Sequence, residues 1–118
     1  MMTYVDGFVL AVPTANKERY IEHARSCVPV FKKYGAVRCV ENWGVNTPVG
    51  QVTSFPRAVQ MEEGETVLFS WIIWPSKDAR DKGMEELIKD PFFDSEEEFS
   101  IFDPQRMLIG GFETIVDE

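Results

Sequence analysis

Three segments of this 118-residue chain are apolar on both faces of a strand, and they constrain its fold more than any other feature. They read "TYVDGFVLAV" at 3–12, "TVLFSWIIW" at 66–74 and "RMLIGGFETIV" at 106–116. Successive side chains of a strand point to opposite faces, so an antiparallel strand with one wet face alternates apolar and polar residues. These three segments do not alternate. We therefore expect each of them to be covered on both sides.

The segments between them predict two helices and two shorter strands. Apolar residues at helical spacing favour a helix before Gly35, with a kink or restart at Pro29. Ser76 can cap a second helix, and Gly83 within it allows a close neighbour. Strands are expected at 36–43 and 57–61, with a long loop "GVNTPVGQVTSFP" at 44–56.

The order strand, helix, strands, helix, strand predicts a ferredoxin-like split βαβ fold of the α+β class, as one domain over 1–118. Its antiparallel sheet has helices on one face only. The second apolar face needs another cover, and the simplest one is a second copy of the same sheet. The sequence therefore predicts a homodimer, but it leaves open which sheet face lies at the seam and whether larger assemblies form.

Charge and targeting signals narrow the partners. The net charge of −8 argues against binding to nucleic acid or to an anionic membrane surface. The start of the chain lacks the basic region of a signal peptide, which favours a cytoplasmic location. There we expect Cys27 and Cys39 to be free thiols. Without a CxxC motif, and with His23 as the single histidine, no metal site and no cofactor are predicted.

Three stretches also resemble a known family. "YVDGFVLAVP", "FSWIIWPSKDARD" and "FDPQRMLIGGFETIVDE" are similar to the YbaA-like family of uncharacterised bacterial proteins, and the similarity runs along the whole chain. The resemblance implies a dimeric α+β barrel, in which two ferredoxin-like protomers pack sheet against sheet. It implies no catalytic residue and no cofactor.

Charged residues inside the apolar strands are the candidates for chemistry, because burying an unpaired charge is costly. Glu41 shares a strand face with Cys39 and Trp43, where desolvation would raise its pKa and suit it to acid–base work. The alternatives are that Glu41 pairs with an arginine across the sheet or that it solvates the end of the strand. The other such residues are Asp6, Arg38, Arg106 and Glu113.

These other candidates have both a binding and a structural interpretation. Asp6 could accept hydrogen bonds near the dimer seam or at a pocket mouth, or it could have a structural role. Arg106 could hold an anionic ligand, or it could form a local pair with Asp103. Trp71 and Trp74 lie on opposite faces, so only one of them can line a given cavity.

The sequence names no reaction and no ligand, and it leaves open whether the protein is an enzyme. The favoured interpretation is a small apolar or aromatic molecule bound between sheet and helices, with a cofactor-independent enzyme as one form of it. Glu41 and Trp43 would line this pocket under the 44–56 loop. Asp6, Arg38, Arg106 and Trp71 complete the candidate ligand-binding set. A non-catalytic dimeric interaction module and heme handling through His23 are the alternatives.

Overall fold

The computed structural model describes residues 3–96 and 100–118 and shows a four-stranded antiparallel sheet in the order β2-β3-β1-β4. Its strands are β1 (Tyr4–Pro13), β2 (Arg38–Trp43), β3 (Glu65–Trp74) and β4 (Leu108–Glu113). The two longest strands, β1 and β3, pair over ten residues in the middle of the sheet, and β2 and β4 are its edges.

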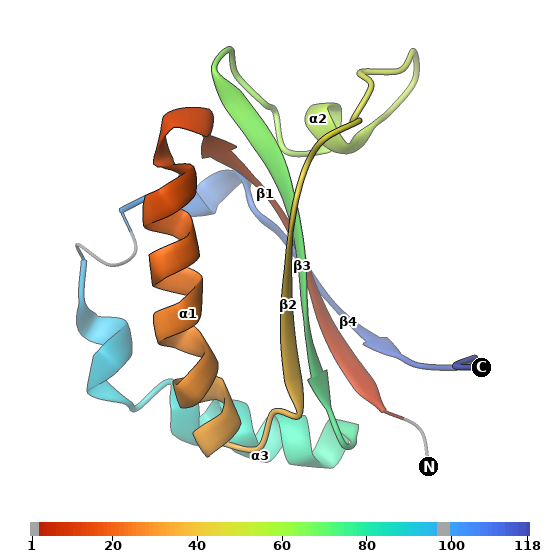
Figure 1. The fold of residues 1–118 in the computed structure, drawn as a ribbon. Coiled ribbons are helices and arrows are strands. Elements are labelled where there is room, and N and C mark those ends of the chain that lie inside the picture. Colours follow the sequence, from red (N-terminus) through yellow and green to blue (C-terminus); the bar gives the residue numbers. More distant parts are fainter. Residues whose placement is uncertain (1–2, 97–99) are drawn as a thin grey trace.

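Two helices cover one face of this sheet. Figure 1 shows α1 (Lys17–Lys33) and α3 (Lys77–Leu87) on the same side, with the segment that follows α3 passing outside α1. The remaining helical segments are α2 (Phe55–Ala58) and short 3₁₀ turns at Thr14–Asn16, Pro91–Asp94 and Pro104–Arg106. The ferredoxin-like α+β class predicted from the element order is confirmed.

The helix α1 runs through Pro29 without interruption, so the predicted restart does not occur. Its end is as expected: Gly35 has a φ of +112°, and its N–H donates to the Lys32 carbonyl while that of Ala36 donates to Phe31. This left-handed residue satisfies helix-end carbonyls, and glycine adopts it without steric cost. Ser76 caps α3 as predicted, accepting from the N–H of Ala79 at 3.1 Å.

The predicted strand at 57–61 is wrong. Phe55–Ala58 form one helical turn, capped by Ser54, whose hydroxyl accepts from the N–H of Arg57 at 3.0 Å. Pro56 lies in that first turn, where its missing N–H costs nothing. Ser54 and Pro56 are helix-start signals, and here they outweigh the β-branched Val59, which favours a strand.

The core lies between the sheet and α1. Leu10, Val12 and Leu68 are at most 2 % exposed and pack with Tyr20 and Ala24 of the helix. A smaller cluster of Ala11, Val59 and Val67 lies under the 44–64 connection, on the other face of the sheet. The sequence also predicts that the segment after α3 is anchored by phenylalanines, namely Phe92, Phe93, Phe99 and Phe102, of which Phe99 lies outside the described residues. In the part of the chain that the structure describes, no helix is both long and apolar enough to cross a bilayer.

The rest of that second face is open and apolar, as the two-faced strands predict. It carries alternate residues of the three neighbouring strands, among them Val9, Phe69, Trp71, Ile73, Leu108 and Phe112. Phe69 is 42 % exposed and Phe112 61 %. Ile109 points to the helix side of edge strand β4, by its pairing with Phe8, yet it is 63 % exposed.

Candidate functional site

Two neighbouring cavities lie between α1 and the sheet, and Glu41 borders both. We call them the inner cavity, of about 210 Å³, and the outer cavity, of about 350 Å³. Tyr20, Ala24 and Glu41 line both of them. The inner cavity is otherwise mainly apolar, with walls from Phe8, Leu10, Phe31, Phe93, Phe102 and Met107. The outer cavity has Lys17, Arg25, Cys39 and Trp43 around its mouth.

A hydrogen bond from Tyr20 to Glu41 separates the two cavities. The Tyr20 hydroxyl donates to Glu41 Oε2 over 3.0 Å, and Ser70 also hydrogen-bonds the carboxylate. Glu41 as a residue is exposed on edge strand β2, but its carboxyl group, held by Tyr20 and Ser70, is partly removed from water. This desolvation raises the pKa of Glu41, and the hydrogen bonds from Tyr20 and Ser70 oppose the shift. Burial, together with the Glu41 charge, raises the pKa of Tyr20, which stays a neutral donor.

Trp43 lies at the outer cavity only, where the Lys17 ammonium stands 5.5 Å from the centre of its ring. The structure therefore brings Glu41 and Trp43 together on the helix-facing side of β2, as their spacing predicts. The alternative of an arginine partner for Glu41 does not hold for the described residues, where Tyr20 and Ser70 take that place. Tyr20 lies on the apolar stripe of the helix, where its spacing predicts packing rather than a hydrogen bond to Glu41. Ser70 was the available signal, a polar residue inside "LFSWIIW".

The expected lid over this pocket is wrong. None of residues 44–56 lines the inner or the outer cavity, and Phe55 instead packs against Phe69 on the open face, with ring centres 5.9 Å apart. Arg57 holds the loop there by donating to the carbonyls of Val49 and Gly50. The loop leaves β2 at the sheet edge, so it can turn to either face, and its contacts select the one opposite α1.

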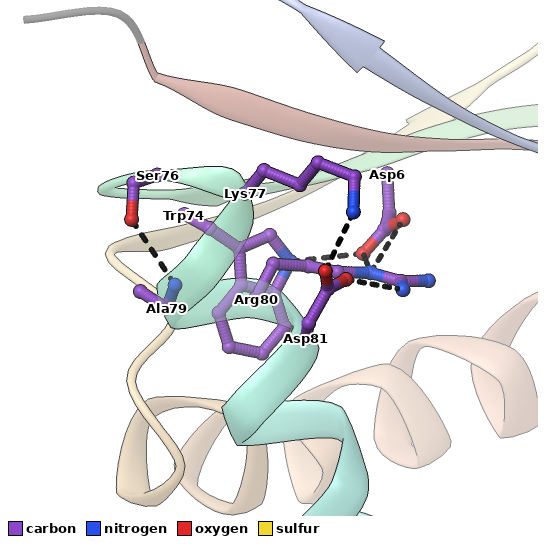
Figure 2. Close-up of polar contacts among 7 residues, drawn as sticks. All are labelled: Asp6, Trp74, Ser76, Lys77, Ala79, Arg80 and Asp81. Atoms are coloured by element: carbon purple, nitrogen blue, oxygen red, sulfur yellow. Dashed lines mark hydrogen bonds and ion pairs between the residues drawn. The ribbon is translucent and has the colours of Figure 1, made fainter.

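Asp6 is the centre of a buried polar network away from the cavities (Figure 2). It is 2 % exposed and accepts from Trp74 Nε1 at 2.9 Å and from Arg80 Nε at 3.1 and 3.2 Å. Arg80 also reaches Asp81, which pairs in turn with Lys77. The network ties β1 to the end of β3 and to α3. Of the two interpretations of Asp6, these contacts match the structural one.

Arg106 is likewise engaged by protein groups. Its Nη1 and Nη2 meet the two oxygens of Glu65 at 2.8 and 2.7 Å, and its Nε donates to Asp103 at 3.1 Å. Hydrogen bonds from this guanidinium lower the pKa of Glu65. The local pair with Asp103 is present, so a ligand at Arg106 would have to displace carboxylates.

The two remaining candidates lie elsewhere. Arg38 is exposed on edge strand β2, and its register with Ile73 places it on the open face. Trp71 lines a cavity of about 720 Å³ on that same face, next to Phe69. Trp74 is fully buried on the helix side, so the two tryptophans do lie on opposite faces. Within residues 3–96 and 100–118, no cluster of three or more His, Cys, Asp or Glu could hold a metal ion.

The protein has relatives with clear sequence similarity and structural neighbours with little. Residues 3–104 match the family described as "Protein of unknown function (DUF1428)". The "Uncharacterized protein YbaA" of Escherichia coli is 49 % identical over 117 residues, covering 99 % of this chain and 100 % of its own, and the protein of that name in Shigella flexneri gives the same values. A dimeric ferredoxin-like protein from an uncultured marine organism superposes with a TM-score of 0.61 at 11 % identity, covering 100 % of this chain and 99 % of the other. The similarity to that structure supports the fold. The sequence similarity to YbaA agrees with the resemblance seen in the sequence, and the family match shows that the chain belongs to the DUF1428 family.

Proposed function

We propose that this protein binds a small apolar or aromatic molecule between α1 and the sheet, with Glu41 as its polar contact. The observation that carries the proposal is the position of the Glu41 carboxyl, at the boundary of two cavities and held by Tyr20. Small-molecule sites are concave and mostly apolar, with a few placed polar groups and perturbed pKa values. The inner cavity has the apolar walls and Glu41 the polar group.

The surroundings of Glu41 indicate the chemistry of the ligand. An ionised carboxylate accepts hydrogen bonds, whereas a raised pKa keeps a larger fraction of the group protonated and able to donate one. A phenol, an amine or a carbonyl compound of small size could meet it with its polar end. The aromatic rings of Phe31, Phe93 and Phe102 would cover the apolar body of such a molecule.

The same geometry supports catalysis as an extension of binding. A carboxyl group of raised pKa transfers protons at a pH nearer to neutrality than an ordinary glutamate does. A cofactor-independent reaction in this site would use Glu41 as the acid or base, with Tyr20 holding it in position. The binding proposal does not require turnover.

A thermal-shift screen of small aromatic and carbonyl compounds tests the binding proposal. A ligand present at 100 times its dissociation constant should add about 2.7 kcal/mol to the free energy of unfolding. Glu41→Gln keeps the shape of the side chain and should weaken the binding of any compound found. Glu22→Gln, on the exposed side of α1, is the matched control and should bind as wild type. Equal binding by all three proteins would remove Glu41 from the site.

We also propose that a second copy of the chain covers the open sheet face, as in a dimeric α+β barrel. Exposed apolar side chains gather on that face, beside a cavity of about 720 Å³. Contiguous apolar surface of this kind is typical of an interface, and two-fold dimers are the commonest assembly. The structural neighbour from a marine organism is described as dimeric, which agrees with the proposal.

This face also favours the second candidate function, a non-catalytic dimeric interaction module. Under that hypothesis the two cavities beside α1 would bind nothing, and Glu41→Gln would leave all measurable properties except stability unchanged. Heme handling has less support, because His23 is 7 % exposed and its Nε2 lies 3.7 Å from Cys27 Sγ. We also propose a cytoplasmic location, where the thiols of Cys27 and Cys39 would stay reduced.

A further inference from the structure

A thiol and an imidazole stand side by side on the cavity-facing side of α1. His23 and Cys27 are four residues apart, a spacing that stacks side chains on one face of a helix. Cys27 Sγ lies 3.7 Å from His23 Nε2, within hydrogen-bonding range for sulfur. His23 is 7 % exposed, whereas Cys27 is only half-buried. Cys27 is thus partly exposed, and the imidazole beside it is buried.

Aromatic packing fixes the orientation of the imidazole. Its ring centre lies 5.9 Å from that of Tyr20 and 6.4 Å from that of Phe102. His23 and Cys27 both line the inner cavity, together with these two aromatic residues and Glu41. An apolar molecule in the cavity would therefore rest against the sulfur.

We propose that the His23–Cys27 pair makes the inner cavity reactive, so that Cys27 adds covalently to small apolar α,β-unsaturated carbonyl compounds. The inference rests on the proposed function in one respect, since it takes the inner cavity as the site that admits the compound. It adds a substrate class and a reaction to that site. The thiolate is the reactive form of cysteine, and a neighbouring imidazole is a suitable base to produce it.

The step balances without an oxidant or a reductant. The imidazole of His23 takes the proton of the Cys27 thiol. The sulfur then forms a bond to the β-carbon of the compound, and the π electrons of the C=C bond move to give an enolate. The imidazolium returns the proton to the enolate, which leaves a neutral thioether adduct and a neutral imidazole.

The second cysteine of the chain provides an internal comparison. Cys39 is also half-buried and lines the outer cavity, but the charged group near its thiol is the Glu41 carboxylate rather than an imidazole. Burial, together with the charge of Glu41, raises the pKa of Cys39. It should therefore react slowly with the same reagent in the same molecule.

The first experiment compares the two cysteines in the wild-type protein. The folded chain is treated with N-phenylmaleimide, an aromatic α,β-unsaturated carbonyl compound, and the adducts at each cysteine are followed by peptide mass spectrometry. We expect Cys27 to react at least about tenfold faster than Cys39. This is a cautious threshold, because a positioned base contributes about 10²–10⁴-fold to a rate. Equal rates, or a faster Cys39, would overturn the inference.

The second experiment removes the base. His23→Phe keeps an aromatic ring beside Tyr20 and Phe102 but cannot take a proton, so the Cys27 rate should fall about tenfold or more. The Cys39 rate in the same sample should stay at the wild-type value, and a rise in it would reveal unfolding. In that case His23→Gln takes the place of His23→Phe. An unchanged Cys27 rate in a folded variant contradicts the role of His23.

A saturated analogue separates this inference from the proposed function. N-phenylsuccinimide has nearly the shape of the maleimide but no C=C bond to attack, so it reports binding alone. The binding site is supported and the reactive thiol refuted if the succinimide gives a thermal shift that depends on Glu41 while Cys27 reacts with the maleimide no faster than Cys39. The reactive thiol is supported and the role proposed for Glu41 refuted if Cys27 reacts fast in a way that depends on His23 while no thermal shift depends on Glu41.

Discussion

Replacing Asp6 tests whether this buried carboxylate is a structural element or a ligand-binding group. Asp6→Ala removes the acceptor of both Trp74 and Arg80. Asp6→Asn keeps an oxygen that can accept from the indole but removes the charge that pairs with the guanidinium. The two changes therefore divide the network into its hydrogen-bond and its ionic parts (Figure 2).

The structure sets the expected magnitudes. Trp74 is 0 % exposed, so its Nε1–H would be left without an acceptor in Asp6→Ala, at a cost of about 1–3 kcal/mol. Arg80 also loses its main partner, and removing one member of a buried pair costs about 3–5 kcal/mol in total. The side chain of Arg80 is 29 % exposed and keeps Asp81, so water and that carboxylate solvate part of its charge in both variants. Asp6→Asn differs because it keeps an acceptor for the buried indole of Trp74. We expect Asp6→Asn to lose about 1–3 kcal/mol.

Urea unfolding at one fixed protein concentration, followed by tryptophan fluorescence and circular dichroism, measures these differences. A domain of this size has about 5–15 kcal/mol of stability, so both variants should remain folded in buffer. The exposed Asp117→Ala is the control and should stay within about 0.5 kcal/mol of wild type. The reasoning is refuted if Asp6→Ala loses less than about 1 kcal/mol, or if Asp6→Asn is as damaging as Asp6→Ala.

Three further predictions concern the helix contact, the cavity carboxyl and the open face. A Cβ at Gly83 would clash with the Tyr34 carbonyl oxygen and lie 2.8 Å from the Trp74 ring, so Gly83→Ala should lose about 1–3 kcal/mol in urea unfolding. Lys82→Ala, at the exposed neighbouring position, should unfold as wild type does. The raised pKa of Glu41 means that the folded chain holds this proton more tightly than the unfolded chain does. The stability of wild type relative to Glu41→Gln should therefore fall as the pH rises above the ordinary glutamate pKa of 4.5 and through the raised pKa of the folded state. A stability difference that is flat or grows with pH contradicts the shift. In light scattering at micromolar concentration, wild type should be a dimer and Phe112→Asp, which puts a charge on the open face, a folded monomer. Ile88→Asp, on the helix side, should remain dimeric. A monomeric wild type rules the dimer out.

Much of the site was open to prediction from the sequence because strand periodicity is local. Alternation along β2 placed Glu41 beside Cys39 and Trp43, and the absence of alternation in β1, β3 and β4 predicted a second apolar face. The course of residues 44–61 was predicted wrongly, as strand and lid. A loop that leaves an edge strand can turn to either side, and a short segment such as "SFPRAV" carries both helix and strand signals.

The order of residues along the chain is enough to predict the pattern of faces: which residues of each strand and helix are apolar, which charges lie among them, and hence the α+β arrangement. The partners of those charges become visible only when the elements are packed together. Asp6 pairs with Arg80, which is 74 positions away along the chain. Arg106 pairs with Glu65, and Glu41 accepts a hydrogen bond from the hydroxyl of Tyr20. An apolar pattern depends on neighbours along the chain, so its period can be seen in the sequence. The partner of a buried charge depends instead on which distant element packs against it, and such pairs have no fixed spacing in the sequence.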